Sequence, residues 1–210
     1  MNIKIYSESF EENITTAYGK VHYRIIYPRC EYPIRTESEG RINDEFISLA
    51  LSGRSFIRNS IRDAEAHENI PSEYISDYSF EMRPTYVGNL FVSFLMEIIA
   101  TTNTGKVGIT YGAKTYKTSS AKRVTLEMLF RVAGVKEILW ERIISSSSVV
   151  SGKCSFEDFL IHYKITDFFL TSEEMILFFP PDSIVRDHNE YIIVPIKYKE
   201  LKDSLKYQIN

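Results

Sequence analysis

The pattern of apolar and polar positions in the first third of the chain predicts two strands and one long helix. From Thr15 to Tyr27 the two classes alternate with a period of two, which is typical of a half-buried strand, and Ile3–Tyr6 predicts a shorter one. We expect Pro28 to end the longer strand, because proline has no N–H to donate to a ladder. Ser38 is the predicted N-cap of the helix. The residues of its apolar face recur at three- and four-residue spacings: Ile42, Phe46, Leu49, Ala50, Gly53, Ile57 and Ile61.

Further strands and short helices are predicted in the rest of the chain. Thr125 is the predicted cap of a helix that reaches about Ser145, and Ser155 caps a helix over Phe156–Tyr163. The nearly continuous apolar run Leu90–Ile99 predicts a central strand buried on both faces. This run lies within a predicted strand at Tyr86–Thr101. The other predicted elements are strands at Tyr74–Pro84, Val107–Lys117, Lys164–Leu170, Met175–Phe179 and Tyr191–Ile196, and a closing helix near Lys199–Leu205.

The order of these elements predicts the fold class and the division into lobes. Strands and helices do not alternate as regular β-α-β units, so the class is α+β: a long helix packed on strands, followed by an antiparallel sheet with helices. We expect an N-terminal lobe over residues 1–71, or extending to about 101, and a C-terminal lobe over residues 102–210.

Composition narrows the class of protein. The chain has 210 residues with 14 Tyr and 13 Phe, which favour sheet, and its net charge of −3 does not indicate a nucleic-acid partner. Cys30 and Cys154 are too few for a structural zinc site; we expect free thiols, with one disulfide as the alternative in an exported protein. No metal or cofactor is predicted.

The first residues lack the apolar core of a signal peptide, which predicts a cytoplasmic protein as the sequence stands. Removal of a leader would leave the same pattern in an extracellular or cell-surface protein.

Several segments, in order, resemble a known pair of bacterial domains. Tyr27-Pro28 with Gly40-Arg41-Ile42-Asn43 is similar to the start of DUF4163. Three later segments are similar to DUF3298: Thr125–Phe130, Phe168–Phe179 and Val194–Leu201. The glycine-rich turn of that family is reduced here to Gly105-Lys106-Val107-Gly108. The two domains occur in tandem in RsiV-type anti-sigma factors, which sense lysozyme, and in the non-catalytic region of PdaC-type peptidoglycan deacetylases.

The resemblance implies a non-catalytic binding or structural module whose ligand is a protein or a peptidoglycan-related polymer. Arg54 and Arg58 lie four residues apart on the long helix, and Tyr111 and Tyr116 lie on a strand. We expect these side chains to be exposed, and exposed Tyr and Arg are favoured at interfaces, so they are the predicted ligand-binding residues. The alternative is a hydrolase whose site includes Asp187, His188 and Glu190, although a turn attracts the same residues. A third possibility is a module that only dimerises.

Overall fold

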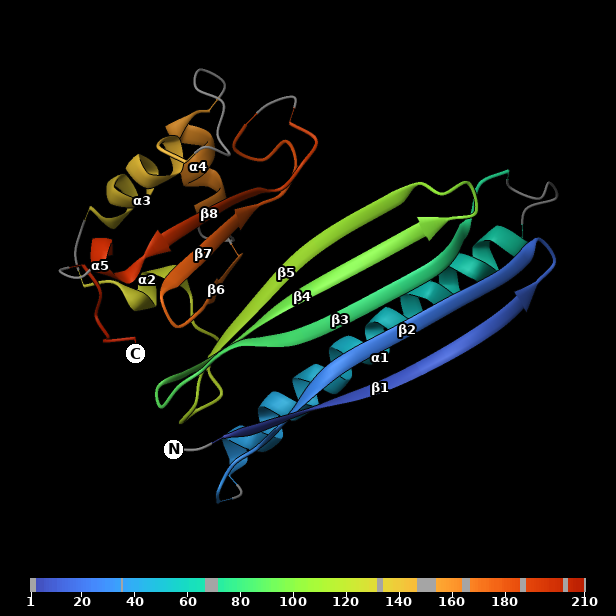
Figure 1. Cartoon of the computed structure of the whole chain (residues 1–210), viewed down its shortest axis with the longest axis horizontal. Helices are drawn as coiled ribbons and strands as arrows, with labels where there is room; N and C mark the ends of the chain where they lie inside the picture. Colours follow the sequence, from blue (N-terminus) through green and yellow to red (C-terminus); the bar gives the residue numbers. More distant parts are fainter. Residues whose placement is uncertain are drawn as a thin grey trace. The chain divides into compact units, whose positions relative to one another are not determined.

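The computed structural model describes residues 3–34, 36–66, 72–131, 134–146, 154–163, 167–185, 188–201 and 204–209. The fold class is α+β, as predicted: a long helix packs on a five-stranded mixed sheet, and a three-stranded antiparallel sheet with short helices follows (Figure 1). The first sheet has the spatial order β1-β2-β3-β4-β5, formed by β1 (Lys4–Thr16), β2 (Gly19–Glu31), β3 (Ile75–Val87), β4 (Phe91–Thr102) and β5 (Val107–Lys117). The second has the order β6-β7-β8, formed by β6 (Asp167–Leu170), β7 (Glu174–Phe179) and β8 (Ile192–Lys197).

Strands β1 and β2 form a long antiparallel hairpin, which corrects two predictions. The first strand is 13 residues long and does not end at Tyr6, and β2 continues past Pro28 to Glu31. Proline is tolerated because β2 pairs with β3 only over His22–Ile26, so Pro28 lies beyond that ladder and needs no N–H for a second neighbour. The glutamates of β1 interrupt the apolar pattern, so the sequence predicted too short a strand. Charged residues are nevertheless common on an edge strand such as β1.

The long helix α1 (Glu37–Glu65) joins β2 to β3, which run parallel to each other. Its N-cap is Thr36 and not the predicted Ser38: the Thr36 hydroxyl accepts a hydrogen bond from the Glu39 amide at 3.2 Å, whereas Ser38 is buried in the first turn. The predicted apolar face is confirmed by the buried residues Ile42, Phe46, Ala50, Ile57 and Ile61.

The remaining strands of the first sheet lie close to their predicted positions. Strand β5 has the predicted bounds, and β4 is fully buried only over Phe91–Leu95, while its second half is partly exposed. The expectation of burial on both faces therefore holds for the first half of β4 alone.

The C-terminal part contains four helices in its described residues: α2 (Leu126–Leu129), α3 (Val135–Ile144), α4 (Phe156–Tyr163) and α5 (Tyr198–Leu201). The helix predicted from Thr125 to about Ser145 is divided. Helix α2 ends because Phe130 is extended (ψ 151°) and forms a β-bridge with Leu205, and α3 begins after Gly134, which adopts φ 99°, a left-handed conformation. Helix α4 has the predicted bounds and the Ser155 hydroxyl caps it by accepting from the Glu157 and Asp158 amides. Residues 164–166 of the predicted sixth strand and residues 202–203 of the closing helix lie outside the described residues.

The chain divides into two compact units, and β3, β4 and β5 contribute residues to both. Unit 1 contains residues 1–84, 95–112 and 119–121; unit 2 contains residues 85–94, 113–118 and 122–210. In unit 2 a cluster of buried apolar side chains joins the short helices to the three-stranded sheet through Leu139, Phe159 and Phe179, among others. None of the helices in the described ranges has the length and apolarity needed to cross a membrane.

Candidate functional site

Unit 1 has a groove of about 730 Å³ between the β1–β2 hairpin and the first turns of α1. We call it the tyrosine–carboxylate groove. Its lining residues are Tyr6, Glu8, Tyr27, Pro28, Arg29, Cys30, Glu31, Glu39, Gly40, Asn43, Asp44 and Ile47. The register of the hairpin brings its polar residues together, because Tyr6 lies opposite Arg29 and Glu8 lies opposite Tyr27.

Glu8 is the central acceptor of the groove. One carboxylate oxygen accepts from Arg29 Nη1 at 2.9 Å, and the other accepts from the Tyr27 hydroxyl at 3.0 Å. These hydrogen bonds, the Arg29 bond foremost, lower the pKa of the Glu8 carboxyl group, so it is ionised at neutral pH. An ionised carboxylate accepts hydrogen bonds but cannot serve as a general acid, which favours binding over acid catalysis at this position.

The floor and the helical wall of the groove are fixed by backbone contacts. The Asn43 side chain accepts from the Cys30 amide at 2.8 Å and donates to the Cys30 carbonyl at 2.9 Å, so it holds the end of β2 against α1. Glu39 accepts from the Tyr32 amide at 3.2 Å. The wall that faces a ligand is thus set by secondary structure rather than by a loop.

The rim of the groove carries exposed aromatic and acidic side chains. Tyr6 is 48% exposed, and a hydrogen bond with Glu31 raises the pKa of its hydroxyl. Asp44 is exposed and has no polar partner within the described part of the chain. Glu8, Glu31, Glu39 and Asp44 face a single cationic side chain, Arg29, so the lining is net negative.

Burial disfavours the thiolate form of both cysteines of the chain. Cys30 is buried in the groove wall, and burial raises its pKa to about 12. Burial also raises the pKa of Cys154, and both thiols are free, as the sequence predicted. No group of three or more His, Cys, Asp and Glu side chains is placed to hold a metal ion among the described residues.

The predicted binding arginines both form ion pairs inside the chain. Arg58 Nη2 donates to both oxygens of Glu12, at 2.7 and 2.8 Å, and Arg54 donates to the Tyr23 hydroxyl at 3.2 Å and to Glu12 at 3.4 Å. The Tyr23 hydroxyl in turn donates to Glu12. These bonds, with Arg58 first, lower the pKa of Glu12 to about 2. The structure gives the two arginines a role in attaching α1 to β1; their role in ligand binding stays a prediction.

The two predicted tyrosines are separated. Tyr111 is half-buried on β5 in unit 1, whereas Tyr116 is fully buried and belongs to unit 2. The expectation that Tyr116 is exposed is therefore wrong, because its ring packs against Phe94 at a centroid distance of 6.4 Å. Binding through Tyr111 stays a prediction.

The alternative hydrolase site falls partly outside the described residues, which exclude Asp187. The His188 amide donates to the Asp182 carboxylate at 3.0 Å, and the His188 carbonyl accepts from the Asp182 amide at 3.0 Å. Asp182 itself has φ 57°, and Glu190 is exposed. This local bonding is typical of a closed turn.

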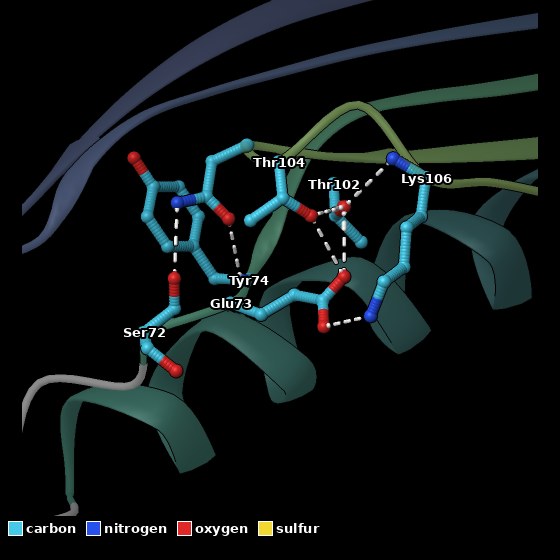
Figure 2. A network of polar contacts seen from close by, with 7 residues as sticks. Ser72, Glu73, Tyr74, Thr102, Thr104 and Lys106 are labelled. Carbon is cyan, nitrogen blue, oxygen red and sulfur yellow. Dashed lines mark hydrogen bonds and ion pairs between the residues drawn. The ribbon is translucent and has the colours of Figure 1, made fainter.

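A second polar cluster ties the turn between β4 and β5 to the start of β3. Figure 2 shows the Glu73 carboxylate at its centre, where it accepts from Thr102, Thr104 and Lys106 at 3.1, 2.9 and 2.7 Å. The bond from Lys106 contributes most to a lowered pKa of Glu73. Thr102 ends β4, and Thr104 and Lys106 flank Gly105 in the turn that follows, so the cluster holds that turn in place.

Sequence reasoning missed the tyrosine–carboxylate groove because it ended the first strand at Tyr6. The signal was present: Tyr6 and Glu8 alternate on one strand, and Tyr27 and Arg29 alternate on the next. Extending the strand through the glutamates would have placed these four residues on one face.

Comparisons with known proteins show the fold. No protein-family model matches the chain, and no curated protein matches it. Two solved structures are similar over nearly the whole length. A member of the DUF3298 family from Bacteroides fragilis has a TM-score of 0.68 at 10% identity, covering 98% of this chain and 94% of that one. A DUF3298 family protein from Pseudomonas aeruginosa has a TM-score of 0.62 at 13% identity, covering 98% and 95%. The chain therefore has a DUF3298-like fold.

Proposed function

We propose that this protein is a non-catalytic binding domain and that its tyrosine–carboxylate groove takes a basic segment of a protein ligand. The observation that carries the proposal is the charge of the lining, four carboxylates against Arg29. Such a surface attracts lysine and arginine side chains and accelerates their encounter with the protein. The proposal also includes two resemblances noted in the sequence. The chain resembles domains that sense lysozyme, and its N-terminal end resembles DUF4163.

A peptidoglycan-related glycan is the second candidate, favoured by the exposed ring of Tyr6 beside the paired Glu8 and Arg29. An aromatic face packs against the apolar face of a sugar, while carboxylate and guanidinium groups bond its hydroxyls. A peptidoglycan-related ligand requires the domain to work outside the membrane, the second location considered from the sequence.

The experiment measures binding of the protein to lysozyme by calorimetry and to insoluble peptidoglycan by co-sedimentation. For a basic protein ligand we expect binding that weakens with salt, and the double variant Glu31→Gln/Asp44→Asn should bind about tenfold more weakly. Glu37→Gln removes an acidic side chain of α1 outside the groove, so it is the matched control and should bind like the wild type.

For a glycan ligand, Tyr6→Ala should abolish retention on peptidoglycan, while Tyr111→Ala should leave it unchanged. Loss of binding in Tyr111→Ala with retention in Tyr6→Ala would move the site to the residues predicted from sequence. The proposal fails when the wild-type protein binds neither ligand.

A further inference from the structure

Unit 1 also contains a cavity of about 310 Å³ at the C-terminal end of helix α1. Its walls come from the β1–β2 hairpin, the last turns of α1 and the start of β3. We call it the two-tyrosine pocket, after Tyr18 and Tyr74, which both line it. The volume is at the lower end of the range of small-molecule sites, so the pocket has room for a compact ligand.

The aromatic wall of the pocket is held in place by bonds within the unit. The rings of Tyr18 and Tyr74 meet edge to face, with centroids 4.7 Å apart and planes at 62°. The Tyr18 hydroxyl donates to the Ile61 carbonyl at 3.3 Å, and the Tyr74 amide donates to the Asn103 side chain at 3.0 Å. The Tyr74 hydroxyl lies against Gly19, where the Cβ of any other residue would overlap it. The wall therefore exists before a ligand arrives.

The polar cluster around Glu73 supports the same wall. Glu73 precedes Tyr74 in the chain and also lines the pocket, and Lys106 donates to its carboxylate at 2.7 Å (Figure 2). Asn103, from the turn that the cluster holds, donates its backbone N–H to the Tyr74 carbonyl at 3.0 Å. Because Lys106 neutralises Glu73, this carboxylate positions Tyr74 and does not supply charge to a ligand.

The charge that remains available in the pocket is negative. Asp63 lines it, is exposed, and has no hydrogen-bond or ion-pair partner in the described part of the chain. The last turn of α1 adds the negative end of the helix dipole. Burial, and after it the charge of Glu65, raises the pKa of the Tyr18 hydroxyl, so a further carboxylate acts on this wall. None of the lining residues that the structure describes is Lys, Arg or His.

The rest of the lining is apolar or already bonded. Val21, Ile57 and Ile61 contribute buried aliphatic side chains, and the Ser60 hydroxyl donates to the Phe56 carbonyl at 3.0 Å. The pocket thus offers few donors to an anion, whereas a cation finds a carboxylate and two aromatic rings.

We propose that the two-tyrosine pocket binds a small organic ammonium ion with an apolar body. The apolar body packs against the aliphatic side chains, and the ammonium group lies against the tyrosine rings beside Asp63. An aromatic ring attracts a cation through its quadrupole, which is the usual basis for recognising quaternary ammonium groups. For a compact probe we expect a dissociation constant on the order of 0.1–1 mM. This site is separate from the tyrosine–carboxylate groove, because no described residue lines both.

Titration with benzyltrimethylammonium, followed by the NMR signals of isoleucine methyl groups, tests the site. The signals of Ile57, Ile61 and Ile75, which line the pocket, should shift and saturate, while that of Ile196 on β8 should not. Phenylacetate has a similar size and the opposite charge, and it should bind at least about tenfold more weakly. Equal affinities for the two ions, or no shift at the three lining residues, would overturn the proposal.

Variants of the lining separate attraction of the cation from burial of its apolar part. Tyr74→Leu should weaken benzyltrimethylammonium by about fivefold and leave neutral benzyl alcohol unaffected, and Asp63→Asn should weaken the cation by about threefold. Equal losses for the cation and the alcohol in Tyr74→Leu would contradict recognition of the charge by the ring.

A pocket-filling substitution tests where the probe binds. Ser60→Phe places a ring in the pocket and should abolish binding of benzyltrimethylammonium. Ser55→Phe, at an exposed position of α1 that does not line the pocket, is the matched control and should bind like the wild type. Circular dichroism checks that each variant is folded. A folded Ser60→Phe protein that binds the probe with wild-type affinity would place the site elsewhere and overturn the proposal.

Discussion

Glu12 attaches the edge strand β1 to helix α1 by accepting from Arg58 and from the buried hydroxyl of Tyr23. We expect Glu12→Ala to destabilise the protein by about 1–2 kcal/mol, because the Tyr23 hydroxyl then loses its acceptor. Glu12→Gln keeps an acceptor and should cost less than half as much. Urea denaturation gives both values, with Glu37→Gln as the control on an exposed pair. Equal losses in the two Glu12 variants would show that charge, not the buried hydroxyl, dominates.

His22 joins three strands on the other face of the hairpin. Its Nδ1 lies 2.6 Å from Asp77 of β3, and its Nε2 lies 2.9 Å from Glu11 of β1. The bond with Asp77, then that with Glu11, raises the pKa of the imidazole. The native state thus holds the proton to a higher pH than the unfolded chain does. The contribution to stability is complete below the unfolded pKa of about 6.5 and is lost as the pH rises through the raised folded value.

We therefore expect His22→Gln to lower the free energy of unfolding at pH 5.5 by up to about 1 kcal/mol, and by less at pH 9, since all three side chains are partly exposed. Asp77→Asn should reduce the same pH dependence. The measurement is the urea midpoint of each variant at both pH values. A deficit that is the same at pH 5.5 and pH 9 would contradict the assignment.

Arg54 and Arg58 show which properties of a single residue can be predicted from the sequence and which cannot. Their four-residue spacing predicted that both lie on one side of the helix, and in the structure both contact Glu12. Their partner Glu12 lies more than 40 residues away in the chain, on a strand that the periodicity did not reveal, so the ion pairs were not predictable. The burial of Tyr116 was missed for a similar reason: alternation along β5 does not tell which of its faces is covered.

Gly53 lies in the middle of α1, where the helix meets β2 and β3. A Cβ at this position would lie 3.6 Å from Ile25 Cδ1 and 3.9 Å from Phe80, which is ordinary van der Waals contact. We expect Gly53→Ala to stabilise the protein by about 0.5–1 kcal/mol, since alanine has the higher helix propensity. Gly53→Leu should destabilise it, because the larger side chain has no room. Thermal unfolding compares the two; a loss of stability in Gly53→Ala would show that the contact is tighter than the distances indicate.

Most of the helices and strands could be predicted where apolar spacing is regular and bounded by caps or turns. β5 and α4 have their predicted bounds, because a glycine turn precedes the first and Ser155 caps the second. β1 was cut short since serines and the glutamates Glu8, Glu11 and Glu12 interrupt its apolar pattern, and the burial of glutamates depends on partners in other elements. The division between α2 and α3 depends on the extended backbone at Phe130 and the left-handed backbone at Gly134, which a helical apolar pattern does not reveal.

Unit 2 contains parts of both sheets, joined by a buried polar contact. The Ser93 hydroxyl on β4 lies 2.7 Å from that of Thr115 on β5 and accepts from the Leu170 amide on β6 at 3.0 Å. We expect Ser93→Ala to destabilise the protein by about 1–3 kcal/mol, because the Leu170 amide is left buried without this acceptor. Ser7→Ala, on the exposed part of β1, should have little effect. Urea denaturation measures both; a neutral Ser93→Ala would mean that the sheets are held together by apolar packing alone.

The architecture of the chain was predictable from its order of elements, and the candidate site was not. The α+β arrangement follows from local periodicity, and two DUF3298 structures share the fold at 10% and 13% identity. The groove depends on the register of β1 against β2, because only that register sets Tyr6 beside Arg29 and Glu8 beside Tyr27. Register is a long-range property. It is fixed here by the β1–β2 hairpin, and the apolar pattern predicted a first strand that was too short.

The parallel pairing of β2 and β3 has a consequence for how this chain can change in length. Helix α1 has 29 residues and each strand has 13, and at about 1.5 and 3.3 Å per residue each spans roughly 43 Å. Helix α1 therefore carries the chain back along the length of one strand, from the end of β2 towards the start of the parallel strand β3 (Figure 1). One added helical turn would overshoot the start of β3 by about 5 Å unless both strands gained roughly two residues. We expect insertions and deletions among proteins of this fold to fall in the loops, or to occur in the helix and both strands together.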